Sequence, residues 1–368
     1  MASIRDLIRD NVKRIVPYSP GKVSDEVRRE LGIQEVTKLA SNENPLGPSP
    51  FAVEAMREAA PDVRLYPDPT CFDLTRDLAE HLDVEPDNVI IGRGSDEVIH
   101  MLGLAFLRPG DEVIYASPPF ALYPYTATVM DCRSVVVPVR DYTHDLEAMA
   151  EAVTPNTRMI FIANPHNPTG TSVTRDQADR FMAAVPDDVI VVWDEAYYEY
   201  VATDEFPDTF GYWRDGRKAV VLRTFSKIYA LAGLRIGYGV ASAEMIRALR
   251  LVLEPFNVSS IAQAAARASL RDSEQVARSR RVNEEGKAFL YGRFDAMGLT
   301  YVPTQANFVF VDVGRHSAKV FDRMMRRGVT VRTGDIWGWD TWIRVTIGTR
   351  EQNEKFLAAL QSALAAQD

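Results

Sequence analysis

The stretch Ala219-Val220-Val221-Leu222-Arg223-Thr224-Phe225-Ser226-Lys227 decides the fold and the chemistry of this chain. It begins with an apolar run, which indicates a strand in the protein interior, and Lys227 follows shortly after that strand. A lysine amine forms a Schiff base with an aldehyde only when it is unprotonated, a state that burial or a neighbouring cation favours. A Ser-Lys pair after a strand is more often a surface lysine at a strand edge, so the interpretation depends on the rest of the chain.

Groups suited to a phosphate surround this lysine in the sequence. Thr224 and Ser226 carry hydroxyls, and Arg235 follows in the next motif. A guanidinium binds phosphate through paired hydrogen bonds. A lysine-bound aldehyde beside a phosphate site describes pyridoxal 5'-phosphate, which we expect as the cofactor.

A glycine-rich loop, Gly92-Arg93-Gly94-Ser95-Asp96-Glu97, precedes a predicted helix. Free N–H groups and the positive end of the helix dipole favour an anion at such a place. We assign Gly94, Ser95 and Asp96 to the cofactor site, since glycine and serine allow a close approach of the backbone. Helix capping alone is the competing interpretation, and it becomes weaker if the loop lies beside Ser226 and Arg235.

Two further strand ends carry polar residues that this cofactor needs. An apolar run from Val189 leads to Asp194, and open α/β sheets bind ligands at the carboxyl ends of their strands. A buried carboxylate must be paired, and the protonated pyridine nitrogen of the cofactor is the partner that makes the ring an electron sink. Tyr197 and Asn167 are placed to reach the phenolic oxygen of the ring. We take Lys227, Asp194 and Tyr197 as the catalytic set, although a helix cap at Asp194 and a turn former at Asn167 are plain alternatives.

Strand and helix patterns alternate over most of the chain. The predicted strands are Asn88 to Ile91, Glu112 to Ala116, Ser134 to Val139, Met159 to Ala163, Val189 to Asp194, Ala219 to Thr224 and Ile236 to Ala241. Helical patterns between most of them predict an α/β domain with a mostly parallel seven-stranded sheet covered by helices. After residue 243 the pattern changes to long helices and a short mixed region. We therefore predict a large cofactor-binding domain at 46–243 and a smaller α+β domain formed by 1–45 and 244–368.

Motifs spread along the whole chain carry a resemblance to a known family. They are Pro17-Tyr18-Ser19-Pro20-Gly21-Lys22, the run from Asn42 to Pro50, Arg64-Leu65-Tyr66-Pro67-Asp68 and Arg344-Val345-Thr346-Ile347-Gly348. With the Asn, Asp and Lys motifs, they resemble fold-type I pyridoxal-phosphate transferases, in the class I/II aminotransferase group, and most of all the histidinol-phosphate aminotransferase family. Ala230 and Ser259 depart from the family pattern, where glycine and asparagine are expected, and His166 stands where asparagine is commoner.

The resemblance implies roles for several more residues. Phe120 matches the position whose aromatic ring stacks on the cofactor. Tyr66 matches a tyrosine that crosses the interface of a homodimer and binds the phosphate of the partner subunit's cofactor. The substrate-binding positions that the family pattern indicates are Tyr18, Asn42, Arg332 and Arg344.

The resemblance also implies a reaction. It is transamination between L-histidinol phosphate and 2-oxoglutarate, which gives imidazole acetol phosphate and L-glutamate, a step of histidine biosynthesis. Arg344 would bind the phosphate of one substrate and the carboxylate of the other, with Arg332 and Tyr18 as auxiliary phosphate donors. An aromatic amino-acid (phenylalanine) aminotransferase is the close alternative, and a pyridoxal-phosphate-dependent threonine-phosphate decarboxylase is a more distant one. A regulator built on this fold needs a DNA-binding module, for which we expect no room in this chain.

Composition disfavours several classes of partner. The formal net charge of −9 disfavours binding to nucleic acid or to an anionic membrane, since both require a basic surface. Cys71 and Cys132 lack the CxxC spacing of a zinc or redox site, and the five histidines show no metal-ligand spacing, so we expect no metal. Residues 1–13 have the pattern of neither a signal peptide nor a membrane span. We expect a cytoplasmic enzyme that acts on small molecules.

Overall fold

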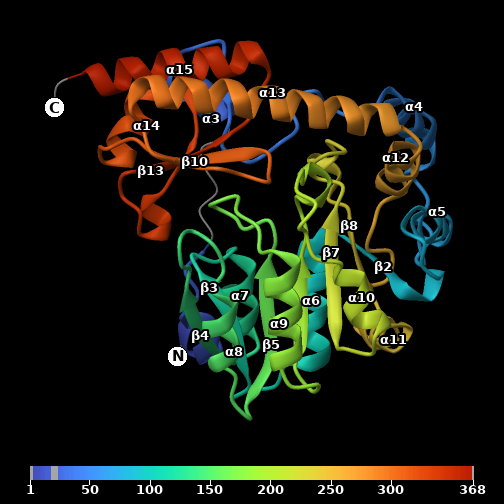
Figure 1. The fold of residues 1–368 in the computed structure, drawn as a ribbon. Helices are drawn as coiled ribbons and strands as arrows, with labels where there is room; N and C mark the ends of the chain where they lie inside the picture. The colour runs from blue at the N-terminus through green and yellow to red at the C-terminus, as the bar shows by residue number, and fades with distance from the viewer. Residues whose placement is uncertain (1–2, 18–23, 367–368) are drawn as a thin grey trace.

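The structure is a computed structural model that describes residues 3–17 and 24–366. Figure 1 shows a large sheet in the lower part of the molecule and a smaller sheet above it, with long helices over the top. Both sheets contribute residues to the pocket described below. Tyr18, for which the sequence suggested a substrate role, lies outside the described residues.

The large sheet has seven strands in the order β2-β8-β7-β6-β5-β3-β4. Their bounds are β2 Val89–Gly92, β3 Glu112–Ser117, β4 Arg133–Pro138, β5 Thr157–Ala163, β6 Ile190–Asp194, β7 Ala219–Thr224 and β8 Gly237–Ala241. β8 runs antiparallel to β2 and β7, whereas the other neighbours pair in parallel. The predicted sheet is therefore confirmed. β8 reverses because residues 225–236 join it to β7 without the long helical crossover that a parallel pair requires.

Helices cover both faces of this sheet because its strands are apolar on both sides. On β6, Val191 and Trp193 belong to one core cluster, and Ile190 and Val192 belong to another. The first cluster includes residues of α5 Phe72–Leu82, α8 Leu146–Glu151, α9 Arg175–Ala184, α10 Thr209–Arg214 and α12 Ser260–Leu270. The second includes residues of α6 Ser95–Phe106, α7 Leu122–Val129 and α11 Ala243–Arg250. Burial of strands on both faces is typical of a sheet built mainly from parallel strands.

The second sheet has four antiparallel strands in the order β12-β13-β10-β9. Their bounds are β9 Tyr301–Val302, β10 Phe308–Asp312, β12 Arg332–Thr333 and β13 Trp342–Thr346. One face packs on α13 Ser273–Met297, α14 Ser317–Met325 and α15 Arg350–Ala365 through side chains such as Val309 and Val345. Because side chains alternate along a strand, Trp342 and Arg344 of β13 point to the opposite face.

Shorter elements connect these layers. α4 Pro50–Ala59 packs against α12, and β1 Thr37–Lys38 pairs in parallel with β11 Val329–Thr330. α3 Ser24–Leu31 precedes β1 in the chain. The short 3-10 helices are η1 Ala60–Asp62, η2 Pro86–Asn88, η3 Tyr198–Tyr200, η4 Ala232–Leu234 and η5 Asp335–Trp337.

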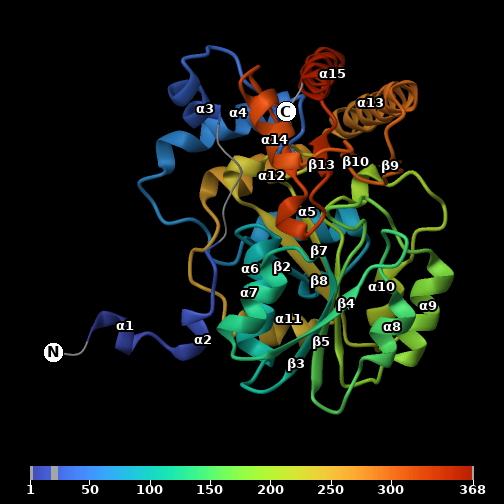
Figure 2. The ribbon, with the colours of Figure 1, turned by 90° about the vertical axis from the view of Figure 1, so that its left-hand side faces the viewer.

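Two segments outside residues 46–243 pack against helices of the large sheet. In α2 Asp10–Lys13, the Asn11 side chain donates hydrogen bonds to the carbonyl oxygens of Thr128 and Val129 at 3.0 and 2.9 Å. α11 contacts α6. α1 Ile4–Leu7 projects from α2 away from the body of the molecule (Figure 2). The domain boundaries at residues 45 and 243 stay a prediction, and these contacts favour assigning both segments to the large unit.

Two departures from the family pattern have a structural explanation. Ala230 has a φ of 57°, in the left-handed region that glycine adopts at no steric cost, so alanine carries strain there that glycine avoids. Ser259 is the N-cap of α12 and accepts a hydrogen bond from the backbone N–H of Ala262 at 3.2 Å. Serine and asparagine are comparable N-cap residues, so this replacement preserves the start of the helix.

Candidate active site

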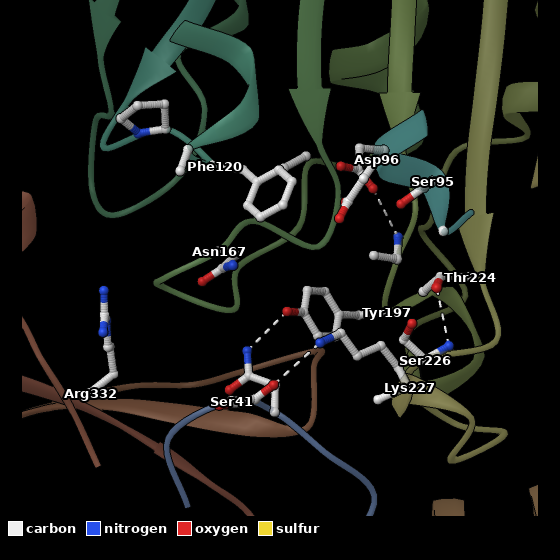
Figure 3. Close-up of a pocket in the computed structure, with 18 of the residues that line it drawn as sticks. Ser41, Ser95, Asp96, Phe120, Asn167, Tyr197, Thr224, Ser226, Lys227 and Arg332 are labelled. Carbon is white, nitrogen blue, oxygen red and sulfur yellow. Dashed lines mark hydrogen bonds between the residues drawn. The ribbon is translucent and has the colours of Figure 1, made fainter. Parts of the chain in front are cut away.

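A cavity of about 610 Å³ lies at the carboxyl ends of the large-sheet strands, against the second sheet. β6 and β7 supply Asp194 and Thr224 to its lining, and β12 and β13 supply Arg332 and Arg344. Figure 3 shows Thr224 at one end of the pocket and Arg332 at the other. This edge is where open α/β sheets bind their ligands.

The cavity brings together most of the site residues that the sequence suggested. Its lining includes Asn42, Gly94, Ser95, Asp96, Phe120, Asn167, Asp194, Tyr197, Thr224, Ser226, Lys227, Arg235, Arg332 and Arg344. Tyr66 is not part of this lining; its side chain is 82% exposed, and its ring stacks on Phe256 with 4.6 Å between the ring centroids. These positions suit the predicted roles, which themselves stay predictions.

Lys227 reaches the pocket from the loop that follows β7. Its Nζ donates a hydrogen bond to the Ser41 carbonyl oxygen at 3.3 Å and lies 5.5 Å from the centroid of the Tyr197 ring. The Tyr197 hydroxyl accepts a hydrogen bond from Asn42 Nδ2 at 2.9 Å. Figure 3 shows the lysine and the phenol side by side in the pocket. Two groups expected to act on the same bound ring therefore lie next to each other.

Asn42 ties the N-terminal segment to the second sheet. Its backbone N–H donates to Thr346 Oγ1 at 2.9 Å, and its carbonyl oxygen accepts from Asn307 Nδ2 at 3.0 Å. Asn42 is buried and has a φ of 57°, which asparagine tolerates better than most residues. Its contacts are thus with the protein itself as well as with the cavity, and its substrate role stays a prediction.

Asp194 is a buried carboxylate at the end of β6. Its Oδ2 accepts a hydrogen bond from the Tyr123 hydroxyl at 2.7 Å, and its Oδ1 accepts one from the backbone N–H of Ala196 at 3.3 Å. Burial raises the pKa of the Asp194 carboxyl to about 6; the Tyr123 hydrogen bond opposes this rise, and the nearby Asp96 carboxylate adds to it. A cationic N–H group in the cavity would favour the ionised form of this carboxylate.

The loop before α6 and strand β8 form a compact site that is suited to an anion. Gly94 is the N-cap of α6, has a φ of 77° and provides no side-chain cap. A Cβ on Gly94 would lie 2.9 Å from Arg235 Nη2, and one on Gly237 would lie 2.5 Å from the backbone nitrogen of Ser95. The two glycines therefore permit the approach of loop, strand and arginine. Helix N–H groups and a guanidinium together favour an anion.

Arg235 has partners on both sides of that anion site. Its Nη1 donates to Ser226 Oγ at 3.5 Å, and its Nη2 pairs with Asp96 Oδ2 at 3.0 Å. Burial raises the pKa of the Asp96 carboxyl, whereas the charge of Arg235 lowers it. Asp96 thus holds the Arg235 guanidinium beside the start of α6. The carboxylate positions the arginine and would not itself contact a bound anion.

Arg344 lies on the opposite side of the pocket and is buried. Its Nη2 donates to the Ala40 carbonyl oxygen at 2.8 Å, and its Nη1 donates to Asn167 Oδ1. Its Cζ lies 5.2 and 5.3 Å from the ring centroids of Phe308 and Trp337. Because the Asn167 amide oxygen accepts from Arg344, the amide N–H groups are oriented as donors towards other acceptors.

Arg332 is the direct cross-strand partner of Arg344 in the β12–β13 pair. Side chains of such partners lie close together on one face of a sheet, and like charges in these positions destabilise it. An anion bound beside both guanidiniums offsets this repulsion. The pair is therefore a second candidate site for an anion, at the other end of the pocket from α6.

His166, the third departure from the family pattern, belongs to the same loop as Asn167. Its Nδ1 lies 2.9 Å from Thr169 Oγ1, and its Nε2 lies 3.1 Å from the Pro118 carbonyl oxygen. Burial holds the pKa of this imidazole well below its usual range, so the ring is neutral. We assign it a structural role in holding the loop.

Tyr123 and Trp337 are among the lining residues of the pocket that sequence reasoning missed. Tyr123 lies in the first turn of α7, three residues after Phe120, which precedes the helix. The closeness of this second aromatic residue to Phe120 in the sequence was the signal that could have found it. Their rings meet edge to face at 5.6 Å. Trp337 is the last residue of the short helix η5, between β12 and β13. No periodic pattern in this segment indicated where its side chain points.

The described residues were also compared with the requirements of a membrane span, a metal site and a reactive thiol. Within residues 3–17 and 24–366, no helix combines the length and apolar character of a membrane span, and no cluster of three or more His, Cys, Asp or Glu side chains is suited to a metal ion. Cys71 and Cys132 are free thiols, and burial raises their pKa values to about 12 and about 11. Thiols in this state are poor nucleophiles.

Comparison with known proteins identifies the family. The model of the family described as aminotransferase class I and II matches residues 34–360. A histidinol-phosphate aminotransferase of Moorella thermoacetica is 54% identical over 97% of this chain and 93% of its own length, and one of Caldicellulosiruptor saccharolyticus is 43% identical over 97% and 100%. The crystal structure of a histidinol-phosphate aminotransferase from Sinorhizobium meliloti, in complex with pyridoxal-5'-phosphate, matches with a TM-score of 0.90, 28% identity and 97% coverage of both chains. The chain therefore belongs to the class I and II aminotransferase family.

Proposed function

We propose that this protein is a pyridoxal-phosphate-dependent aminotransferase that moves the amino group of L-histidinol phosphate to 2-oxoglutarate, acting as a cytoplasmic homodimer. The observation that carries the proposal is a single cavity in which the lysine amine lies between Arg235 on one side and the pair Arg332 and Arg344 on the other, two places suited to an anion. One site suits the phosphate of the cofactor. The other suits an anion on the substrate, and two relatives at 54% and 43% identity are histidinol-phosphate aminotransferases.

The residues present fit pyridoxal 5'-phosphate. When bound, this cofactor supplies an aldehyde for exchange of amines and a ring that accepts electrons. The start of α6 at Gly94 and Ser95, with Thr224, Ser226 and Arg235, would hold its phosphate. The residues that would hold its ring are Phe120, Asn167, Asp194 and Tyr197. The close approach that Gly94 and Gly237 permit is the structural reason for this assignment.

Arg344 and Lys227 have different roles towards the substrate: Arg344 binds it, and Lys227 transfers its proton. Arg344 binds the anionic group through its fork of N–H donors and so orients the Cα–H bond of the substrate. Lys227 would hold the cofactor through its amine, and the same amine, when free, would serve as the general base and acid that moves the proton at the substrate Cα. Tyr197 lies beside the lysine amine, with its hydroxyl oriented by Asn42, and so limits where Nζ can point.

The arginine pair favours a doubly charged substrate group. L-Histidinol phosphate carries a phosphate and no carboxylate, so its anion must be bound by whatever binds the carboxylate of glutamate in the other half-reaction. Arg344 alone matches a monoanionic carboxylate, whereas Arg332 directly across the strand pair adds a second positive charge. Two guanidiniums beside one dianion satisfy both charges.

Replacing Arg332 with alanine is expected to reduce kcat/KM for histidinol phosphate by about 30-fold, corresponding to roughly 2 kcal/mol for one partner of a desolvated charge pair. Phenylalanine, which lacks the phosphate, should lose less. Steady-state kinetics with both donors measures the difference. Arg326→Ala, at an exposed ion pair with Asp322, is the control and should leave both donors unchanged. Equal losses for the two donors would contradict the phosphate role.

A second candidate function, aromatic amino-acid transamination, is favoured by one observation. Trp337 and Ile336 line the cavity, and Phe308 lies beneath Arg344, so an aromatic donor has apolar surface to contact. A wild-type preference for phenylalanine over histidinol phosphate would support this alternative. Product analysis separates both from the decarboxylase reading, because transfer gives a keto product and glutamate whereas decarboxylation releases carbon dioxide.

The dimer part of the proposal rests on Tyr66. This tyrosine is largely exposed on its own chain and stacks on Phe256, which is 41% exposed, and the neighbouring Leu65 is 54% exposed. Exposed apolar residues grouped on one face are typical of an interaction surface. A second copy of the chain that covers this surface would bring Tyr66 to the phosphate site of its partner.

Mixing a Tyr66→Ala chain with a Lys227→Ala chain is expected to restore activity above that of either parent. In the mixed dimer one site receives Lys227 from the first chain and Tyr66 from the second, so it regains both groups. The assay is turnover after joint refolding, with mixed dimers verified by differential tags. As a control, a Tyr66→Ala, Lys227→Ala double variant replaces the Tyr66→Ala chain, and no gain is expected because no lysine remains. Absence of any gain in verified mixed dimers would reject the crossing of the interface.

A further inference from the structure

We propose that Tyr123 is a positioning residue for the reaction: its hydroxyl holds the Asp194 carboxylate in place and keeps the proton of the Asp194–pyridine pair on the cofactor nitrogen. This inference rests on the proposed function and adds to it a residue to which the sequence gave no role. It starts from the 2.7 Å hydrogen bond between the Tyr123 hydroxyl and Asp194 Oδ2.

The direction of this hydrogen bond is set by burial. Tyr123 is 2% exposed, and burial together with the Asp194 charge raises its pKa well above the usual value of a phenol. The hydroxyl therefore stays protonated and donates to the carboxylate. Hydrogen bonds to an ionised acceptor are the strong ones, and they favour the ionised form of that acceptor.

The acidic groups around Asp194 act in the opposite direction to the Tyr123 hydroxyl. Asp96, on α6, and Glu195, next to Asp194 in the chain, are both acidic, and each raises the pKa of the Asp194 carboxyl, as does burial itself. Among the hydrogen bonds at this carboxylate, the Tyr123 contact is the short one, and the Ala196 N–H contact is longer at 3.3 Å. Removing the hydroxyl should therefore make Asp194 a stronger base.

The ring of Tyr123 is held so that its hydroxyl cannot easily point elsewhere. It stacks on Phe161 with 4.6 Å between centroids and 7° between planes, and Phe120 meets its edge at 5.6 Å. Tyr123 also lines the cavity, as do Phe120 and Asp194. Tyr123 thus contacts both Phe120, which is predicted to stack on the cofactor ring, and Asp194, which is predicted to bind the ring nitrogen.

The consequence concerns a single proton. A more basic Asp194 would draw the proton from the pyridine nitrogen, leaving a neutral ring that accepts electrons less well. Tyr123→Phe removes the hydroxyl and keeps the ring that packs against Phe161, so the fold should survive. Tyr115→Phe is the matched control: Tyr115 is buried in β3, its ring lies 6.5 Å from that of Tyr123, and its hydroxyl is directed to Ser134.

The experiment loads wild type and variants with cofactor labelled with ¹⁵N at the pyridine nitrogen and records the ¹⁵N resonance. We expect Tyr123→Phe to move it from the wild-type position towards that of Asp194→Asn, where the nitrogen has no carboxylate partner, and Tyr115→Phe to leave it unchanged. We also expect kcat of Tyr123→Phe to fall about tenfold, the effect of one hydrogen bond to a charged group, with KM changed less. A Tyr123→Phe resonance at the wild-type position would overturn the inference.

A second measurement does not depend on the cofactor. The ¹³C carboxyl resonance of Asp194, assigned by its loss in Asp194→Asn, titrates in the unloaded protein, and its midpoint should rise in Tyr123→Phe above the wild-type value. An unchanged midpoint would also overturn the inference. The proposed function fails separately, if wild type binds no cofactor or shows no transamination, so the two failures are distinguishable.

Discussion

Replacing Lys227 with alanine is expected to abolish transamination, with a loss of at least about 10⁴-fold, the upper end of what a positioned proton-transfer group contributes. The protein should remain folded, because the lysine amine makes one hydrogen bond, to the Ser41 carbonyl, and otherwise faces the pocket. Circular dichroism and thermal unfolding check the fold, and coupled assay of glutamate formation checks the activity. Weak binding of the cofactor should persist through the anion site at α6.

Chemical trapping locates the reactive lysine independently of kinetics. Borohydride treatment of the loaded wild type should fix the cofactor to the peptide that contains Lys227. Lys218→Ala is the matched control, because Lys218 lies just before β7, at the other end of the strand, and its Nζ donates to the Asp187 carbonyl oxygen at 2.9 Å. This variant should react and turn over as wild type does. Recovery of the reduced adduct on any other lysine would disprove the assignment.

Replacing Asp194 with asparagine is expected to lower kcat by at least about 10²-fold, or roughly 3 kcal/mol of transition-state stabilisation. Asparagine keeps the shape of the side chain and can still accept from Tyr123, but it carries no charge to hold a proton on the pyridine nitrogen. Asp187→Asn is the control, since Asp187 is an exposed partner of Arg217 before β6. Near-normal kcat in Asp194→Asn would exclude the electrostatic role.

The same variant gives a stability readout in the cofactor-free protein. The folded-state pKa of Asp194, about 6, lies above the ordinary value of 3.8 for an aspartate, so the folded state binds the proton more tightly than the unfolded chain. The burial penalty is therefore absent at low pH and develops as pH rises from about 4 to about 6. At pH 8 the free energy of unfolding of Asp194→Asn should exceed that of wild type by up to about 3 kcal/mol, so the variant should unfold at a higher temperature. This difference in stability should shrink towards pH 4. Calorimetry of the unloaded proteins tests this trend.

Much of the fold follows from local patterns. The apolar strands with polar residues at their ends predicted the sheet and most of its strand bounds, because buried parallel strands need apolar side chains on both faces. The clustering of three site residues could also be predicted from local sequence. The carboxyl ends of neighbouring parallel strands meet at one edge of a sheet, so Asp194 at the end of its strand and Asn167 and Lys227 after theirs come to the same cavity.

Contacts between distant segments were beyond the reach of the sequence. Tyr123 and Asp194 are 71 residues apart, and Asn42 and Thr346 are 304 residues apart, so no local spacing relates them. The antiparallel direction of β8 depends on its short connection to β7. The hydrophobic pattern of a strand does not indicate whether it runs parallel or antiparallel to its neighbour. The packing of α2 and α11 on the large sheet's helices likewise depends on surfaces that form only when the chain folds.

By itself, then, the sequence determined which chemical groups stand at the strand ends, since apolar runs bury strands and leave polar residues at their edges. Only the tertiary structure decided how those groups are held: the phenol on Asp194, the facing pair Arg332 and Arg344, and the placement of Tyr66 away from its own pocket. These arrangements arise from packing between elements far apart in the chain. Side-chain direction at such contacts is set by the neighbours that exclude water, and no single segment contains that information.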